Sequence, residues 1–196
     1  MHRRRAAILC NGASILEHDL SKNDCETIGI NASWKLIQST HHVMTDSAQW
    51  EMYERETGKK AEDMRGLVTG PNGPGEVKVQ VHRSHIPAWS TDPFGFGVYL
   101  CGSVTHMALQ LAVHAWQYKE LYFIGLDLYP QKSGSGKFYG GQWHASAEVR
   151  QRETLAYARA IMWERYAIRV WNVNPDSKCA SFEHKSFEEC FGTERK

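Results

Sequence analysis

Small polar residues follow three consecutive segments that the sequence predicts as strands. They are residues 11–14 (NGAS), 31–33 (NAS) and 45–46 (TD), and each comes directly after an apolar run. In an open α/β sheet, ligands bind beyond the carboxyl ends of the strands, where these residues would meet. A glycine allows the backbone to approach a ligand closely, and the first amides of a serine-capped helix attract an anion. We therefore expect a nucleotide site that includes Asn11, Gly12, Ser14, Asn31 and Ser33.

Two later predicted strands also end in polar residues. Asp127 stands near the end of the continuous apolar run 121–128 (LYFIGLDL), and Asn174 and Ser177 follow the last predicted strand. We add these three residues to the nucleotide-binding candidates. Asp46 and Asp127 fit a helix cap or a solvated loop carboxylate as well as a ligand contact, so these interpretations stay open.

A Gly-, Ser- and Lys-rich segment at about 129–146 is predicted to be a flexible loop. Such a loop can close over a substrate and exclude water. His144 lies just before the next predicted helix, where an imidazole is suited to act as a general base near neutral pH. The other histidines show no metal-ligand spacing, since the neighbours His41 and His42 would point to opposite faces of a strand. We therefore expect no metal site.

The elements that must position these residues alternate between strands and helices. We predict strands at 6–10, 26–31, 41–45, 66–69, 77–82, 121–128 and 168–173, and helices at 15–20, 32–37, 47–56, 97–117 and 147–166. Ser14 and Ser47 are expected to cap the helices that follow them. This alternation predicts an α/β fold, with a single Rossmann-like, three-layer domain over residues 1–196 and a mostly parallel, doubly wound sheet.

The composition argues against several classes of function. The formal net charge is +1, which provides no field for attraction to nucleic acid. No apolar stretch approaches the length of a membrane span or forms a signal peptide, so we expect a cytoplasmic protein. The five cysteines lack C-x-x-C spacing and are expected to be reduced. The sequence also lacks G-x-G-x-x-G after the first strand and a Walker-A lysine, which argues against a simple dehydrogenase or a P-loop enzyme.

Four segments, taken together and in this order, resemble a known family. They are ILCNGASI (8–15), GINASW (29–34), the block from GVYLC (97–101) to GLDLY (125–129), and NVNPDS (172–177). They resemble the bacterial sialyltransferases that use CMP-sialic acid and have a single Rossmann-like domain. That family carries a G-N-G-P-S turn, a C-N-x-x turn, an S-G-V-Y-M-C helix start, a strand end G-I-D-F-Y and a late C-P-N-S. The chain is also similar to a broader group that includes archaeal 6-hydroxymethylpterin diphosphokinase-like proteins and flagellin-modifying transferases.

The resemblance implies a donor site at the ends of the strands. Asn11 and Ser14 would contact the phosphate and ribose region of CMP. Asn31 would form hydrogen bonds near the phosphate or the transferred sugar, and Asn174 and Ser177 would lie near the cytosine.

The same resemblance implies the catalytic residues. Tyr129 and Tyr139 match tyrosines whose hydroxyls stabilise the departing phosphate, and His144 matches the general base that deprotonates the acceptor hydroxyl. The two hydroxyls would do the work that a metal ion does in other transferases. No cofactor is therefore expected besides the CMP-sugar that serves as donor substrate.

Two positions depart from the family pattern. The family has an arginine a few residues before S-G-V-Y, where this chain has DPFGF (92–96). Pro93 and Phe96 thus stand in place of the family arginine and serine, and the loss of a cation and a hydroxyl argues against sialic acid as the sugar. The chain also lacks the C-terminal membrane-associating extension of those enzymes, so we expect a short, stand-alone, phage- or prophage-type relative.

The leading hypothesis is a metal-independent transferase that uses a nucleotide-activated donor, with a CMP-sugar as the first choice. Its partners would be that donor and a glycan or small-molecule acceptor, and a homo-oligomer is left open. One alternative is diphosphoryl transfer of the 6-hydroxymethylpterin diphosphokinase type, which needs ATP and Mg²⁺. The other is a non-catalytic nucleotide-binding module on an inherited fold, which the loss of the arginine favours.

Overall fold

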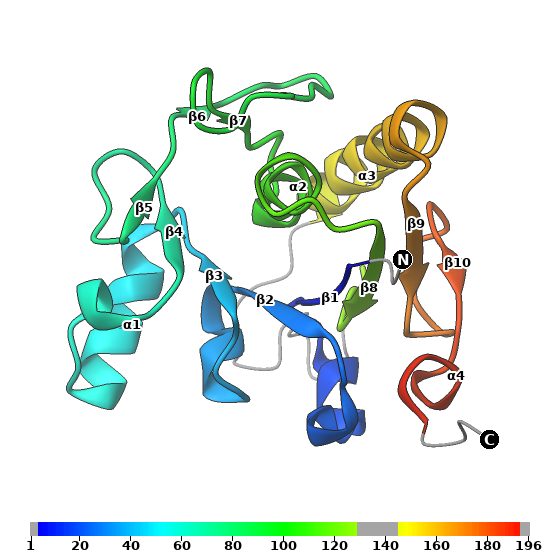
Figure 1. The fold of residues 1–196 in the computed structure, drawn as a ribbon, viewed down its shortest axis with the longest axis horizontal. Helices are drawn as coiled ribbons and strands as arrows, with labels where there is room; N and C mark the ends of the chain where they lie inside the picture. Colours follow the sequence, from blue (N-terminus) through cyan, green and yellow to red (C-terminus); the bar gives the residue numbers. More distant parts are fainter. Residues whose placement is uncertain (1–3, 129–144, 193–196) are drawn as a thin grey trace.

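The computed structural model describes residues 4–128 and 145–192 (Figure 1). The predicted loop at about 129–146, with Tyr129, Tyr139 and His144, therefore lies outside the described residues, except that its last two positions begin α3 (Ala145–Tyr166). None of the helices in the described ranges combines the length and the apolar character that a membrane span requires.

An eight-stranded sheet forms the centre of the molecule. Its strands are β1 (Arg5–Leu9), β2 (Glu26–Ile30), β3 (His41–Val43), β4 (Leu67–Thr69), β5 (Val77–Lys78), β8 (Glu120–Ile124), β9 (Arg169–Asn172) and β10 (Glu183–His184). They lie in the order β10-β9-β8-β1-β2-β3-β4-β5, and every pairing in the described part of the chain is parallel. The predicted mostly parallel sheet is confirmed.

Helices cover both faces of this sheet. The α-helices are α1 (Ser47–Thr57), α2 (Val104–Gln110), which continues as the π-helix η5 (Leu111–Ala115), α3, and α4 (Phe187–Phe191). Alternate side chains of β1 point to opposite faces, so Ala6 and Ile8 join the core under α2 and α3, whereas Ala7 and Leu9 join the core on the α4 side (Figure 1). The predicted three-layer arrangement is therefore confirmed.

A buried glutamine on α2 anchors a segment outside the main sheet. Here β6 (Val81–His82) and β7 (Val98–Tyr99) form a separate two-stranded sheet. The Gln110 side chain accepts hydrogen bonds from the backbone N–H groups of Ser90 (2.9 Å) and Tyr99 (3.0 Å), and it donates to the Tyr99 carbonyl (2.7 Å). Both the oxygen and the nitrogen of the Gln110 amide are thus hydrogen-bonded to the backbone of this segment, which holds the segment against α2.

The predicted helix at 97–117 was wrong in its first turns. The helix begins only at Val104, because residues 98–99 pair with β6. Cys101 and Gly102 then adopt positive φ angles of 45° and 79°, which no α-helix allows, and Ser103 caps the helix through a hydrogen bond from Thr105 N.

Two predicted strands are shorter than expected. The segment 77–82 divides into β5, which joins the main sheet, and β6, which does not. The strand predicted at 121–128 ends at Ile124, because Gly125 turns the chain with a φ angle of 78°. β10 and α4 were not predicted from the sequence, although the capping box between Ser186 and Glu189 is a signal for α4.

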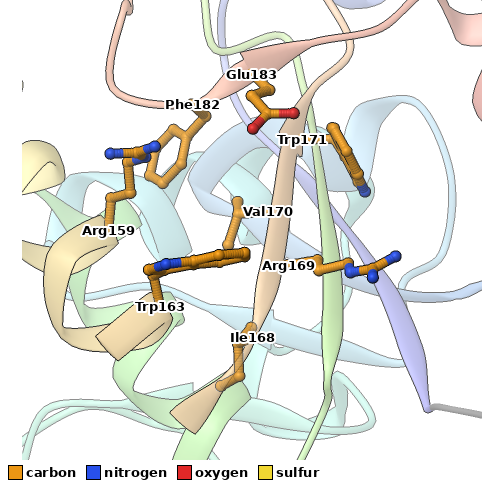
Figure 2. Close-up of a pocket in the computed structure, with 8 residues that line it drawn as sticks. All are labelled: Arg159, Trp163, Ile168, Arg169, Val170, Trp171, Phe182 and Glu183. Atoms are coloured by element: carbon orange, nitrogen blue, oxygen red, sulfur yellow. The ribbon is translucent and has the colours of Figure 1, made fainter. Parts of the chain in front are cut away.

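A cavity of about 220 Å³ lies beside α3 at the start of β9 (Figure 2). Its lining includes Arg159 and Trp163 from α3, together with Arg169 from β9. The Trp163 side chain is 64% exposed. This cavity is at the amino end of β9, so it is away from the strand ends where the candidate residues gather.

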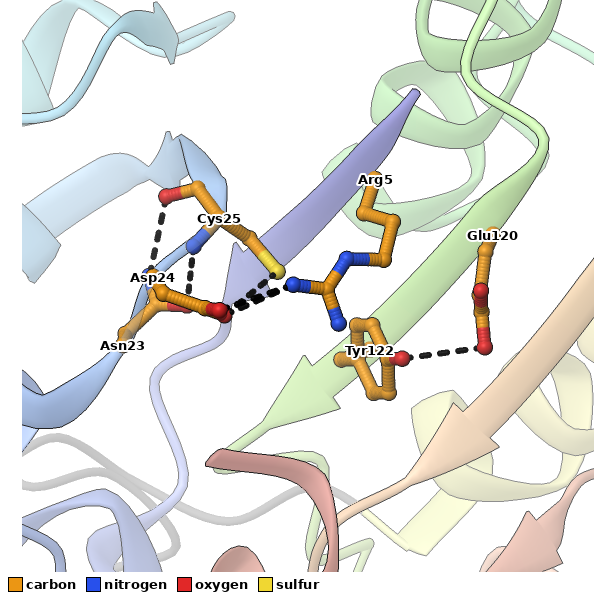
Figure 3. A network of polar contacts seen from close by, with 6 residues as sticks. All are labelled: Arg5, Asn23, Asp24, Cys25, Glu120 and Tyr122. Atoms are coloured by element: carbon orange, nitrogen blue, oxygen red, sulfur yellow. Dashed lines mark hydrogen bonds and ion pairs between the residues drawn. The ribbon is translucent and has the colours of Figure 1, made fainter. Parts of the chain in front are cut away.

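Polar contacts join the amino ends of neighbouring strands (Figure 3). Arg5 of β1 forms an ion pair with Asp24, at 2.9 Å, just before β2. In β8, the Tyr122 hydroxyl donates to Glu120 at 2.9 Å, and the Trp171 indole of β9 donates to the same carboxylate at 3.3 Å. The first contact joins β1 to the segment before β2, and the last joins β9 to β8, at the edge opposite to the candidate site.

The buried His106 of α2 makes stability depend on pH. Its Nε2 lies 2.6 Å from the Ala88 carbonyl oxygen, and burial lowers the pKa of the imidazole to about 4, with the hydrogen bond to Ala88 acting weakly in the other direction. In the unfolded chain the His106 imidazole binds a proton near pH 6.5, whereas in the folded protein it stays neutral until the pH falls to about 4. Stability from this group is therefore present above pH 6.5 and is lost as the pH falls toward 4.

We expect His106→Gln to flatten the pH dependence of folding between pH 6.5 and pH 4. The wild-type slope should exceed that of the variant by about 1.4 kcal/mol per pH unit in this window. Urea unfolding at several pH values measures both slopes. Identical slopes would contradict the role given to this histidine.

Candidate functional site

The strand order reverses between β1 and β8. The chain adds strands on one side of β1 up to β5 and then returns to place β8, β9 and β10 on the other side (Figure 1). The turns after β1 and β8 meet there, with the Cys10 N–H donating to the Ile124 carbonyl and the Gly12 N–H to the Gly125 carbonyl, both at 2.8 Å. Such a reversal is the usual ligand position in a parallel α/β sheet.

A buried carboxylate joins the turns at this position. Asp127 is 3% exposed and accepts hydrogen bonds from the Ser14 N–H (3.0 Å), the Ser14 hydroxyl and the Asn174 amide (2.8 Å). We call Ser14, Asp127 and Asn174 the Asp127 cluster. The anion position predicted at the Ser14 amide is thus filled by a carboxylate of the protein itself.

Glycine is required where the two turns touch. A Cβ on Gly12 would lie 2.4 Å from the Gly125 carbonyl oxygen and 2.5 Å from an oxygen of Asp127, closer than real atoms approach. The NG turn therefore brings the backbone near Asp127 rather than leaving that space for a ligand.

The predicted cap roles of two serines were wrong. The helix after the first turn is the short 3₁₀-helix η1 (Ala13–Glu17), whose N-cap is Gly12, and Ser14 donates to Asp127 instead of capping. At α1 the cap is Asp46, which accepts from the Ala48 N–H at 3.1 Å, and Ser47 is the first residue of the helix.

Asn174 and Ser177 are engaged within the protein. The Asn174 oxygen accepts from the Asp176 N–H at 3.0 Å, and the Ser177 hydroxyl donates to the carbonyls of Leu126 and Asp127. These bonds fix the turn after β9 against the turn after β8. Contact of either side chain with a ligand stays a prediction.

Three other predicted residues have polar atoms without a partner. The Asn11 Oδ1, the Asn31 Oδ1 and the Ser33 hydroxyl are buried and make no hydrogen bond within the part of the chain that the structure describes. A buried polar group left in this state costs about 1–3 kcal/mol. These oxygens follow β1 and β2, so they lie at the carboxyl edge and are the groups there that a ligand would satisfy.

A buried histidine, not singled out from the sequence, holds the turn after β2. Asn31 has a φ angle of 49°, a left-handed conformation that asparagine tolerates. His42 Nε2 lies 2.7 Å from the Asn31 carbonyl oxygen, which can only accept, so this nitrogen carries the proton. Burial lowers the pKa of His42 to about 4, against a weaker opposite effect of that hydrogen bond, so the ring is neutral at pH 7.

The same edge of the sheet continues into a cavity of about 320 Å³ beyond β3 and β4. Thr45, Trp50 and Arg83 are among the residues that line it. The sequence pattern marked Thr45 as a strand end, but no motif pointed to Arg83, which directly follows β6. The described residues contain no group of three or more His, Cys, Asp or Glu side chains placed to hold a metal ion.

We expect Asp127→Asn to destabilise the protein by about 2–3 kcal/mol. The amide nitrogen would replace one oxygen that accepts from Ser14 or Asn174. A buried N–H of Ser14 or Asn174 would then face another N–H group and lose its hydrogen bond. The exposed Asp176→Asn is the matched control and should stay within about 0.5 kcal/mol of wild type. Urea unfolding at pH 7 measures both, and equal small effects would show that the cluster does not hold the turns together.

No protein-family model and no curated protein matches this sequence. Among solved structures, the fold is similar to that of a MAf glycosyltransferase from Magnetospirillum magneticum AMB-1, with a TM-score of 0.63 and 15% sequence identity. That alignment covers 94% of this chain but 34% of the glycosyltransferase, so the chain spans about a third of the length of that protein.

The fold is also similar to that of the sialyltransferase CstII from Campylobacter jejuni. The complex of CstII with cytidine-5'-monophosphate aligns with a TM-score of 0.54 and 17% identity over 95% of this chain and 86% of CstII. A complex of CST-II with a trisaccharide acceptor and CMP aligns with a TM-score of 0.55 and 14% identity over 93% and 86% of the two chains. At these identities the likeness shows that the chain shares the α/β fold of these enzymes.

Proposed function

We propose that this protein is a glycosyltransferase that uses a nucleotide-activated sugar, with a CMP-sugar as the donor. The observation that carries the proposal is the set of oxygens of Asn11, Asn31 and Ser33 at the carboxyl edge, next to the reversal of strand order, which have no hydrogen-bond partner among residues 4–128 and 145–192. The fold shared with CstII, whose solved structures contain CMP, supports the choice of nucleotide.

The chemistry of these oxygens suggests which part of the donor each would contact. An amide oxygen can only accept, so Asn11 and Asn31 suit the hydroxyl groups of a ribose or a sugar. The Ser33 hydroxyl can also donate, which suits a phosphate oxygen. The Ser14 amide is already bonded to Asp127, so in this proposal the phosphate lies nearer Ser33 than the Ser14 turn.

The transfer step is assigned to residues that the sequence analysis identified. His144 takes the proton of an acceptor hydroxyl while that oxygen attacks the anomeric carbon of the sugar. The bond from the anomeric carbon to the phosphate oxygen breaks, and CMP leaves with the bonding electrons. Tyr129, together with Tyr139, donates hydrogen bonds to the departing phosphate, in the role for which other transferases use a metal ion.

Isothermal titration with CMP tests the proposed donor. We expect saturable binding that does not require Mg²⁺, and the absence of binding at millimolar CMP would exclude a CMP-sugar. A magnesium-dependent thermal shift with ATP, without a shift for CMP, would instead favour diphosphoryl transfer. CMP binding without transfer or hydrolysis of a CMP-sugar would identify a non-catalytic module.

We expect His144→Ala to abolish sugar transfer while CMP affinity stays close to wild type, because the base acts on the acceptor and not on the nucleotide. Transfer assays with a panel of CMP-sugars, combined with CMP titration of the same variant, measure the two effects separately. A parallel loss of binding and transfer would contradict the assignment of His144 as the base.

We expect Ser33→Ala to weaken CMP binding and to stabilise the ligand-free protein slightly. The substitution removes a buried hydroxyl that has no partner within the described residues, so its loss relieves the folded state and deprives the phosphate of a donor. Affinity should fall about tenfold, in line with one hydrogen bond to a charged group. The exposed Ser47→Ala serves as the control. Unchanged CMP affinity in Ser33→Ala would place the nucleotide elsewhere.

A further inference from the structure

A cavity of about 300 Å³ lies at the opposite, amino edge of the sheet. It is bounded by η3 (Asn31–Lys35), the segment before β3, α1 and the segment before β4. The residues of its lining that the argument uses are Trp34, Ser39, His42, Tyr53, Lys59 and Arg65.

The wall of this cavity is aromatic. The rings of Trp34 and Tyr53 pack edge to face, with centroids 5.1 Å apart and planes at 89°. Both side chains are only partly buried, and they pack beside the small core formed by Met44, Ala61 and Leu67. Such a wall suits a flat apolar ring.

Two buried polar atoms of the lining residues lack partners. They are the indole Nε1 of Trp34 and the hydroxyl of Ser39, neither of which makes a hydrogen bond within the described residues. The indole N–H can only donate, so it requires an acceptor. Ser39 Oγ and His42 Nδ1 lie side by side, because both come within 2.5 Å of the position that a Cβ on Gly29 would occupy. The glycine therefore makes the space in which these two polar atoms sit.

The rim carries an excess of positive charge. Lys59 and Arg65 are exposed and form no ion pair within the described part of the chain, and Asp63 is the carboxylate that shares the lining with them. By contrast, the nearby Lys35 is paired with Glu56 at 2.5 Å. Two exposed cations in the same lining as the aromatic rings, with no ion-pair partner among the described residues, favour an anion.

We propose that this cavity is a second ligand site, which binds a small organic anion with a flat apolar ring. The ring packs on Trp34 and Tyr53, an acceptor atom of the ligand takes the Trp34 N–H, and the anionic group lies between Lys59 and Arg65. The ligand also contacts His42, whose Nε2 is hydrogen-bonded to the Asn31 carbonyl in the turn at the carboxyl edge. The site does not depend on the proposed transferase activity.

Phenyl phosphate is the probe, and benzyl alcohol is the neutral comparison. In ¹⁵N-labelled protein, the Trp34 indole N–H resonance is assigned by its loss in Trp34→Phe. We expect phenyl phosphate to shift this resonance saturably and benzyl alcohol to bind at least about fivefold more weakly. Arg65→Gln and Lys59→Gln should each reduce phenyl phosphate affinity by up to about fivefold, as expected for an exposed charge.

Arg159→Gln, which removes one exposed arginine of the cavity in Figure 2, is the matched control and should leave the affinity unchanged. Ser33→Ala should also bind phenyl phosphate like wild type, so a loss there would place the probe at the carboxyl edge and overturn the proposal. No saturable shift at Trp34 with millimolar phenyl phosphate would overturn it too. Equal affinity for benzyl alcohol would overturn the assignment of an anion.

Discussion

The carboxylate of Asp127 determines the shape of the candidate site. It lies where the strand order reverses, and it accepts donors from the turn after β1 and from the turn after β9. A buried charge is tolerated only when it is fully hydrogen-bonded, and the Asp127 cluster meets this condition through Ser14 and Asn174. The turns after the central strands are therefore held in one arrangement before a ligand arrives.

This arrangement changes what the carboxyl edge can do chemically. A free backbone N–H at Ser14 would attract a phosphate, but here this N–H already donates a hydrogen bond to Asp127. At this edge, the candidate side-chain oxygens that lack a partner in the described part of the chain are those of Asn11, Asn31 and Ser33. They suit a ligand with many hydroxyl groups better than a polyphosphate, which is why we prefer a sugar nucleotide to ATP as the substrate.

The fold could be predicted from local sequence patterns, whereas the roles of single residues could not. The apolar runs at 6–10 and 121–124 are continuous because both faces of their strands are covered, and this pattern is visible in the sequence. The role of Ser14 depends on a partner 113 positions away, so local rules predicted a helix cap instead. The contact of His42 with Asn31 was not predicted for the same reason, since it crosses from β3 to the turn after β2.

The predicted boundaries of helices and strands were wrong where the backbone conformation departed from the one that the apolar pattern indicates. The sequence of residues 97–103 resembles the start of the apolar α2 helix, but these residues form a strand and a turn. The Gln110 side chain holds β7 through a hydrogen bond to Tyr99, and the positive φ angles of Cys101 and Gly102 exclude a helix. The candidate residues Ser14, Asn31 and Ser33 do follow β1 and β2 as predicted, although η1 and η3 are short 3₁₀-helices. Position relative to a strand end was therefore more predictable than the local helix type.

The distance in sequence between Ser14 and Asp127 has a consequence for how the protein is made. β1 leaves the ribosome before its partner β8, and Ser14 leaves it 113 residues before Asp127. Pairings between such distant segments form slowly, because the chain must first close a long loop. During synthesis, the apolar strand β1 is paired on one side at most, so its other edge stays open to contacts with chaperones or with other nascent chains.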